Sequence, residues 1–278
     1  MPGFTKTYHH PMTSSISDIF PTSTYFVQDQ CTLKIGKEQH DAKLSYTLYI
    51  QPGKKDSDEI LINRTNLKVN GQEIDTKFLG VANSYMEALF PLVCTVEKYS
   101  LSIQNIDEIR KRIQKANAAL HDIYSGEGLD HIRTQFFEAT QTDEKLIHFI
   151  RQLHFMRILE YGIQKFNPKK PYQTSWKVLP VGITDWKGET RYQKEENALS
   201  FEPKIDNAQD IMNDIIRYIH KHDYHVSFDE ETLPLYADFQ NNISYTGKTG
   251  RMKKAETHVC IEAEDKFYYQ HRITIETK

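Results

Sequence analysis

The stretch AKLSYTLYIQ, residues 42–51, alternates apolar and polar side chains along its length. Its apolar members Leu44, Tyr46, Leu48 and Ile50 fall on one side of an extended chain. A period of two is typical of a β-strand with one buried face. A Pro-Gly pair follows directly and is expected to end the strand.

Further strand patterns lie on both sides of this segment and again towards the end of the chain. Asn70-Gly71 between two of them is a two-residue hairpin signal. The predicted strands cover residues 31–35, 60–62, 67–74, 92–99, 176–181, 190–192, 199–201, 224–228, 235–245, 258–263 and 267–275.

Between these two β-rich flanks the apolar period changes to three and four, which predicts helices. Asn105 and Glu108 have the spacing of a capping box and predict a helix start. Thr142, followed by two acidic residues, predicts another. The helix after Thr142 is apolar on most sides from Leu146 to Leu159, so we expect it to be a buried central helix. The predicted helices cover residues 78–89, 106–123, 129–137 and 143–161, and a further helix begins after Asn207 with Ile211, Ile215 and Ile219 inward.

Strands, helices, strands, one helix and more strands follow in that order, which disfavours a doubly wound nucleotide fold. The sequence predicts an α+β fold with mostly antiparallel β flanks packed on a central group of helices. We expect a flexible N-terminal arm over 1–22 and a β-rich segment with the helical core over 23–166. A β-rich C-terminal region with one helix over 172–278 is either separate or part of the same domain. Pro168–Pro171 is the predicted linker.

Composition excludes some classes of function. The 278 residues carry 35 basic and 38 acidic side chains, for a net charge of -3, and the two signs are interspersed. A nucleic-acid partner is therefore not expected. The most apolar stretch, 146–159, contains two arginines and two histidines, so no membrane span is expected. Cys31, Cys94 and Cys260 are predicted to be free, protonated thiols in a cytoplasmic protein.

Three histidines, His220, His222 and His225, form the densest group of possible metal ligands. Neutral imidazole binds zinc and similar ions. The group straddles a predicted helix end, no cysteine lies near it, and histidines also interact favourably with a helix C-terminus. A metal-dependent hydrolase built on this group is one hypothesis. His148 and His154, six residues apart on one predicted helix, do not share a face and are expected to pack in the core.

No other pattern predicts catalysis. The sequence has no Gly-x-Ser-x-Gly elbow, and its close glycine pairs lack the order of a phosphate-binding loop. The sequence therefore predicts no catalytic residue and no cofactor. Aromatic residues are frequent on the predicted strands, as in FYYQHR at 267–272. Since Tyr and Arg are enriched where interfaces concentrate binding energy, a protein-binding surface is predicted at Phe267, Tyr268, Tyr269 and Arg272.

The helical region offers one resemblance. The segments LSIQNIDEIRKRI at 101–113 and TDEKLIHFI at 142–150 lie within Tyr99–Gly162. This stretch, about a quarter of the chain, resembles uncharacterised bacterial proteins, some of them associated with contractile, type VI-like secretion or injection systems. The resemblance rests on helical patterning and implies a bacterial accessory protein, with no catalytic residue to carry over.

Three functions follow from these observations. The first is a non-catalytic protein-binding accessory protein, such as an adaptor, chaperone, immunity protein or structural component of a bacterial secretion system, whose partner is another protein. The second is a carrier of a small apolar ligand or lipid, in which a curved sheet closes over the helix at 146–159. The third is the hydrolase on the histidine group.

Overall fold

The computed structural model describes residues 20–53, 59–97, 99–166, 171–228, 235–247 and 251–278. Within these residues the chain forms a 13-stranded antiparallel sheet and six α-helices. The strands are β1 (Ser23–Ile35), β2 (Glu38–Pro52), β3 (Glu59–Val69), β4 (Gln72–Glu73), β5 (Leu92–Glu97), β6 (Ser100–Ile103), β7 (Pro171–Val178), β8 (Gly182–Gln193), β9 (Ala198–Phe201), β10 (Lys204–Ile205), β11 (Leu235–Tyr245), β12 (Met252–Ala263) and β13 (Phe267–Thr277). The helices are α2 (Lys77–Glu87), α3 (Ile106–Ile123), α4 (Glu127–Thr140), α5 (Asp143–Arg151), α6 (His154–Ile163), the short 3-10 helix η1 (Gln164–Phe166) and α7 (Ala208–Lys221).

The two β-rich flanks belong to one continuous sheet. Its strand order is β10-β8-β9-β11-β12-β13-β1-β2-β3-β5-β6, with β4 paired to β3 and β7 paired to β8. β1 pairs with β13 from Tyr25 opposite Thr277 to Ile35 opposite Phe267, so the first and last strands lie at its centre. The α+β class is confirmed. The helices, however, do not form a central group between two flanks, because the flanks pair directly with each other.

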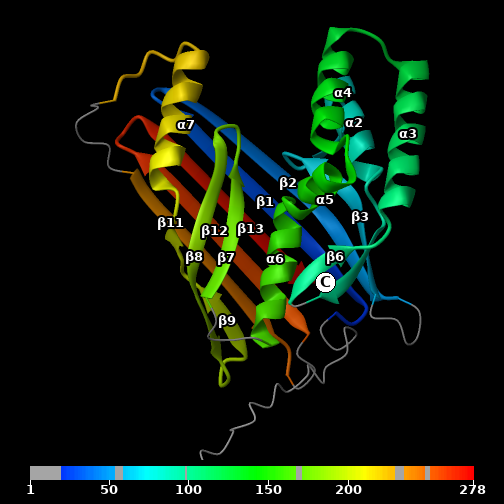
Figure 1. Cartoon of the computed structure of the whole chain (residues 1–278), viewed down its shortest axis with the longest axis vertical. Helices are drawn as coiled ribbons and strands as arrows, with labels where there is room; N and C mark the ends of the chain where they lie inside the picture. Colours follow the sequence, from blue (N-terminus) through cyan, green and yellow to red (C-terminus); the bar gives the residue numbers. More distant parts are fainter. Residues whose placement is uncertain (1–19, 54–58, 98, 167–170, 229–234, 248–250) are drawn as a thin grey trace, which may run out of the picture.

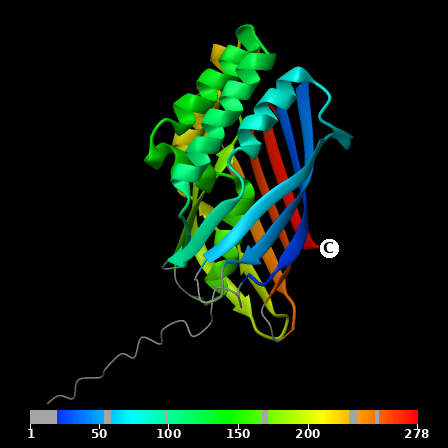
Figure 2. The same cartoon turned by 90° about the vertical axis from the view of Figure 1, so that its right-hand side faces the viewer.

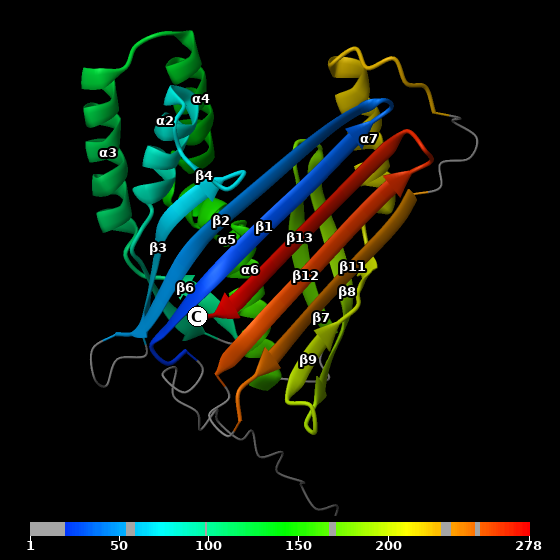
Figure 3. The same cartoon turned by 180° about the vertical axis from the view of Figure 1, so that it is seen from behind.

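The helices instead lie on one side of the sheet (Figures 1 and 2). α5, α6 and the β7–β8 hairpin stand in front of the central strands, α2–α4 gather at one end, and α7 lies near β8 and β11. The opposite face of β2, β1, β13, β12 and β11 carries no described helix (Figure 3). Among the described residues, no helix is both long and apolar enough to cross a membrane.

The main core fills the space between the sheet and this front layer. β13 alternates strictly, with Phe267, Tyr269, His271, Ile273 and Ile275 buried on the covered face. Such alternation gives each strand one covered and one open face. Trp176 and Trp186 of the hairpin meet Phe239 of β11 at ring distances of 5.5 and 5.2 Å. Phe155 of α6 meets Tyr46 and Phe90 at 6.4 and 6.0 Å.

The N-termini of α5 and α3 differ in whether the predicted capping residue forms its capping hydrogen bond. The Thr142 hydroxyl accepts from the Lys145 backbone N–H at 3.2 Å, which confirms the predicted cap of α5. The prediction of a capping box at Asn105 is wrong, since the Asn105 side chain accepts no hydrogen bond from a backbone N–H of the first turn of α3. Its amide instead accepts from Val93 N and donates to Pro91 O, which fastens the start of α3 to β5.

The predicted central helix is two helices. α5 ends at Arg151, Leu153 is extended (ψ 127°), and α6 begins at His154. The break allows two different faces to be buried, with Leu146 and Ile150 inward on α5 and almost all of α6 enclosed. The apolar run that suggested one helix buried on every side is therefore the sum of a half-exposed helix and a buried one.

Other differences from the predictions have simple causes. β1 begins at Ser23, well before the predicted strand at 31, because half-exposed Phe26 on the open face hides the alternation of Tyr25 and Val27. The predicted strand at 224–228 is wrong, since this segment pairs with no strand among the described residues. Residues 1–19 of the predicted arm and 168–170 of the predicted linker lie outside the described residues.

Candidate functional site

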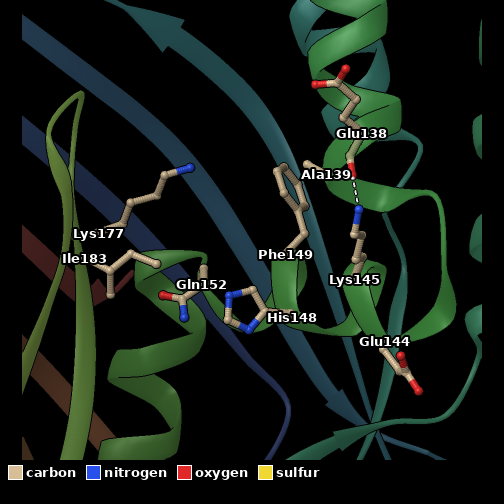
Figure 4. A pocket seen from close by; sticks show the side chains of 9 residues that line it. All are labelled: Glu138, Ala139, Glu144, Lys145, His148, Phe149, Gln152, Lys177 and Ile183. Carbon is tan, nitrogen blue, oxygen red and sulfur yellow. Dashed lines mark hydrogen bonds between the residues drawn. The ribbon is translucent and has the colours of Figure 1, made fainter. Parts of the chain in front are cut away.

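A groove separates the helices from the β7–β8 hairpin (Figure 4). Its volume is about 540 Å³, within the usual range of small-molecule sites. One wall comes from the end of α4 and from α5, and the other from β7 and β8. The lining residues are Glu138, Ala139, Glu144, Lys145, His148, Phe149, Gln152, Lys177 and Ile183.

The α5 wall follows from helix geometry. Lys145, Phe149 and Gln152 are spaced by four and three residues, so they lie along one face. Another face of α5 carries the buried residues Leu146 and Ile150, which pack the helix against the core. Phe149 also packs edge-to-face against the core residue Phe136 at 5.7 Å. The wall is thus an aromatic and amphipathic surface on a fixed helix.

The hairpin wall follows from strand register. Lys177 of β7 pairs with Ile183 of β8, so the two side chains lie next to each other on one face. Their neighbours Trp176 and Thr184 point to the other face and are buried. Ile183 is 38% exposed, and Leu179 in the turn beside it is 51% exposed. Apolar surface therefore remains open to solvent at this edge of the groove.

The charged groups of the groove differ in direction and in partners. The Lys177 ammonium points from the hairpin into the gap, while the carboxylate of Glu144 points away from the hairpin and that of Glu138 lies farther up along α4 (Figure 4). Lys145 Nζ donates to the backbone oxygen of Glu138 at 3.3 Å. Within the part of the chain that the structure describes, Lys177 Nζ has no hydrogen-bond or ion-pair partner.

A buried polar network holds the strand that carries Lys177. The backbone oxygen of Lys177 accepts from His154 Nε2 at 3.3 Å and from the Tyr269 hydroxyl at 3.4 Å. Asp29 Oδ1 lies 2.7 Å from His271 Nε2, and Trp176 Nε1 donates to His271 Nδ1 at 3.1 Å. The network thus joins β1, β13, α6 and β7 at one point beneath the groove.

The indole of Trp176 fixes the protonation of His271. An indole N–H can only donate, so His271 Nδ1 must accept and the ring proton lies on Nε2, which donates to Asp29. Burial acts to raise the pKa of Asp29, but the neighbouring His154 and His271 outweigh it and hold the pKa below its usual value. The Asp29 carboxylate therefore stays ionised and accepts the hydrogen bond from His271 Nε2.

Asp29, His154 and His271 also form the one group of at least three His, Cys, Asp or Glu residues with converging ligand atoms that the described residues contain. Their ligand atoms lie within 4.8 Å of one another. Zinc would need a free electron pair on His271 Nε2, yet the hydrogen bond from Trp176 places the proton there. His154 Nδ1 lies 3.9 Å from Asp29 Oδ2. The chemistry of this group fits a hydrogen-bonded clamp better than a metal centre.

The structure separates the residues that the sequence singled out. His220, His222 and His225 are all exposed at or beyond the end of α7, and their ligand atoms do not converge on one point. Phe267 and Tyr269 are buried on the covered face of β13, whereas Tyr268 and Arg272 lie on the open face. The four aromatic and basic residues therefore do not form one surface.

The three thiols are free and shielded. Burial raises the pKa of Cys31 to about 11 and the pKa values of Cys94 and Cys260 to about 12. They stay protonated near neutral pH, in agreement with the expectation of unreactive thiols.

Comparisons with known proteins add little to this site. No family model and no curated protein matches the chain. A solved structure described as "lipid-protein interactions in lipovitellin" superposes with a TM-score of 0.44 and 9% identity. The match covers 92% of this chain and 25% of that chain, so this chain spans about a quarter of its length. A likeness this weak does not establish a shared fold, and the interpretation of the groove rests on its own residues.

Proposed function

We propose that this chain is a non-catalytic binding protein that holds a small molecule with an apolar chain in the groove between α5 and the β7–β8 hairpin. The observation that carries the proposal is the groove itself. Ala139, Phe149 and Ile183 line it together with the methylene stems of two lysines, and polar atoms are few. Ligand sites commonly combine such a largely apolar lining with a small number of placed polar groups.

A binding role fits this groove better than a catalytic one. Among the lining residues, His148 carries the imidazole that most often serves as a general base. Its ring makes no hydrogen bond to another described residue, so nothing orients it towards a nucleophile. The better oriented histidines, His154 and His271, are enclosed in the clamp beneath the groove. The hydrolase hypothesis therefore gains no support from this geometry.

Calorimetric titration with a series of straight-chain alcohols tests the proposal. Each added methylene should strengthen binding by about 0.8 kcal/mol, or about fourfold, until the groove is full. Ile183→Ser should weaken every member of the series, because it removes apolar surface from the lining. Leu179→Ser is the matched control, since Leu179 is an even more exposed aliphatic residue of the same hairpin but does not line the groove. Absence of binding by any chain length would refute the proposal.

The open face of the sheet supports a second candidate, binding of another protein. Tyr236 on β11 is 58% exposed on this face, where Tyr268 and Arg272 of β13 also lie. A combined Tyr236→Ser and Arg272→Glu variant should lose any stoichiometric partner that the wild type retains in a pull-down. Equal retention by both proteins would count against this face. A partner from a bacterial secretion system stays a prediction.

A further inference from the structure

We infer that the ligand of the groove is a single-chain amphiphile with an anionic head group, which the Lys177 ammonium holds. This inference rests on the proposed function, because it concerns the same groove. It adds a chemical class to the ligand: a carboxylate or a similar anion at one end of an apolar chain.

The two lysines of the groove carry the positive charge that an anionic head group would neutralise. Neither Lys145 nor Lys177 forms an ion pair with a carboxylate in the described part of the chain. Lys145 donates to a neutral backbone oxygen, and Lys177 Nζ donates to no described group. An ammonium beside apolar surface is stabilised when an anion supplies both charge and hydrogen-bond acceptors.

The charged side chains of the groove also point in different directions. By count, Lys145 and Lys177 balance Glu138 and Glu144 among the lining residues. By position they do not, since Lys177 points into the gap, whereas the Glu144 carboxylate points away from the hairpin and the Glu138 carboxylate lies farther up along α4 (Figure 4). The space between the walls therefore faces a cation.

The position of Lys177 is fixed by the contacts of its backbone and of its neighbours in β7. Its backbone oxygen is bound by His154 and Tyr269, and the preceding residue, Trp176, is buried and bonded to His271. The next residue, Val178, is fully buried. The side chain thus rises from a rigid point of β7, next to Ile183, which offers apolar surface for the start of the chain. A head group at Lys177 places the chain along Ile183, Phe149 and Ala139.

Titration with decanoate and with decanol tests the inference, at a pH where the acid is ionised. The wild type should bind decanoate about tenfold more tightly than decanol, the preference expected of a charge-assisted bond that stays open to water on one side. Lys177→Gln should reduce that preference to near one, because it removes the charge and weakens decanoate binding far more than decanol binding. Lys187→Gln is the matched control, because Lys187 is an exposed lysine of the same hairpin outside the groove lining.

The outcomes distinguish a failure of the anionic head group from a failure of the proposed function. Equal binding of decanoate and decanol by the wild type, or a preference that survives in Lys177→Gln, overturns the anionic head group and leaves the groove as an apolar site. Binding of neither compound overturns the proposed function as well. Lys177→Glu adds a positive test, since it should reject decanoate and accept decyltrimethylammonium.

Discussion

Trp176 and Lys177 are neighbours in β7 but face two different parts of the molecule. Trp176 enters the filled space between hairpin and sheet, where it is 1% exposed and packs against Phe239. Lys177 faces the groove, where no described group neutralises its charge. Because successive residues of a strand point to opposite sides, one strand can secure the core and present a binding group.

The comparison shows how a binding group is held without being buried. The side towards the core is packed with aromatic rings and hydrogen-bonded through His271, which fixes the backbone of β7. The side towards the groove then needs no support of its own. Changes on the core side should therefore affect stability and binding together, whereas changes on the groove side should affect binding alone.

The largest effect is expected from Trp176→Ala. Removal of a buried indole leaves a cavity and should lower the free energy of unfolding by about 3–5 kcal/mol. Urea denaturation followed by circular dichroism measures the change. Tyr236→Ala is the control, since this aromatic residue is 58% exposed and should cost less than about 0.5 kcal/mol. Similar losses in the two variants would contradict the division of β7 into a core side and a groove side.

Much of this core side could be predicted from the sequence. The strand predicted at 235–245 has the bounds of β11, and the strand predicted at 267–275 lies within β13. Both predictions depend on alternation, which is local. The order of the strands could not be predicted in this way, because β1 pairs with β13 across almost the whole chain.

The groove and the network of Asp29, His154 and His271 could not be predicted from local patterns either, because they join residues that are far apart in the sequence. Asp29 and His271 are 242 residues apart and carry no motif that links them. Phe149 and Gln152 lie in a run that looks buried on all sides until the break at Leu153 is known. One signal was present in the sequence: Lys177 follows Trp176 in a predicted strand, and strand alternation puts them on opposite faces.

A smaller effect is expected from Asp29→Ala. The change leaves the N–H of His271, which is 3% exposed, without its acceptor and should cost about 2 kcal/mol of unfolding free energy. Because the same network holds the backbone of Lys177, binding of decanol in the groove should weaken as well. Asp29→Asn keeps an oxygen that can accept from His271 and should recover most of the stability. An Asn variant as unstable as the Ala variant would contradict this account of the clamp.

The smallest effect is expected in the pH dependence of stability. Burial lowers the pKa of His154, and the nearby Asp29 offsets this only in part. The folded pKa is therefore below the unfolded value of about 6.5. As the pH falls from about 6.5 towards the lower pKa of the folded state, the unfolded chain binds a proton at His154 that the folded chain does not yet bind. The wild type should then lose stability, at no more than about 1.4 kcal/mol per pH unit.

His154→Gln should remove this part of the loss, since a glutamine amide can still donate to the Lys177 oxygen but does not titrate. Unfolding free energies measured between about pH 7.5 and pH 5, above the range where carboxylates titrate, should fall more steeply for the wild type than for the variant. Equal slopes for the wild type and His154→Gln would show that folding does not lower the pKa of His154, because the folded and unfolded chains would then take up its proton alike.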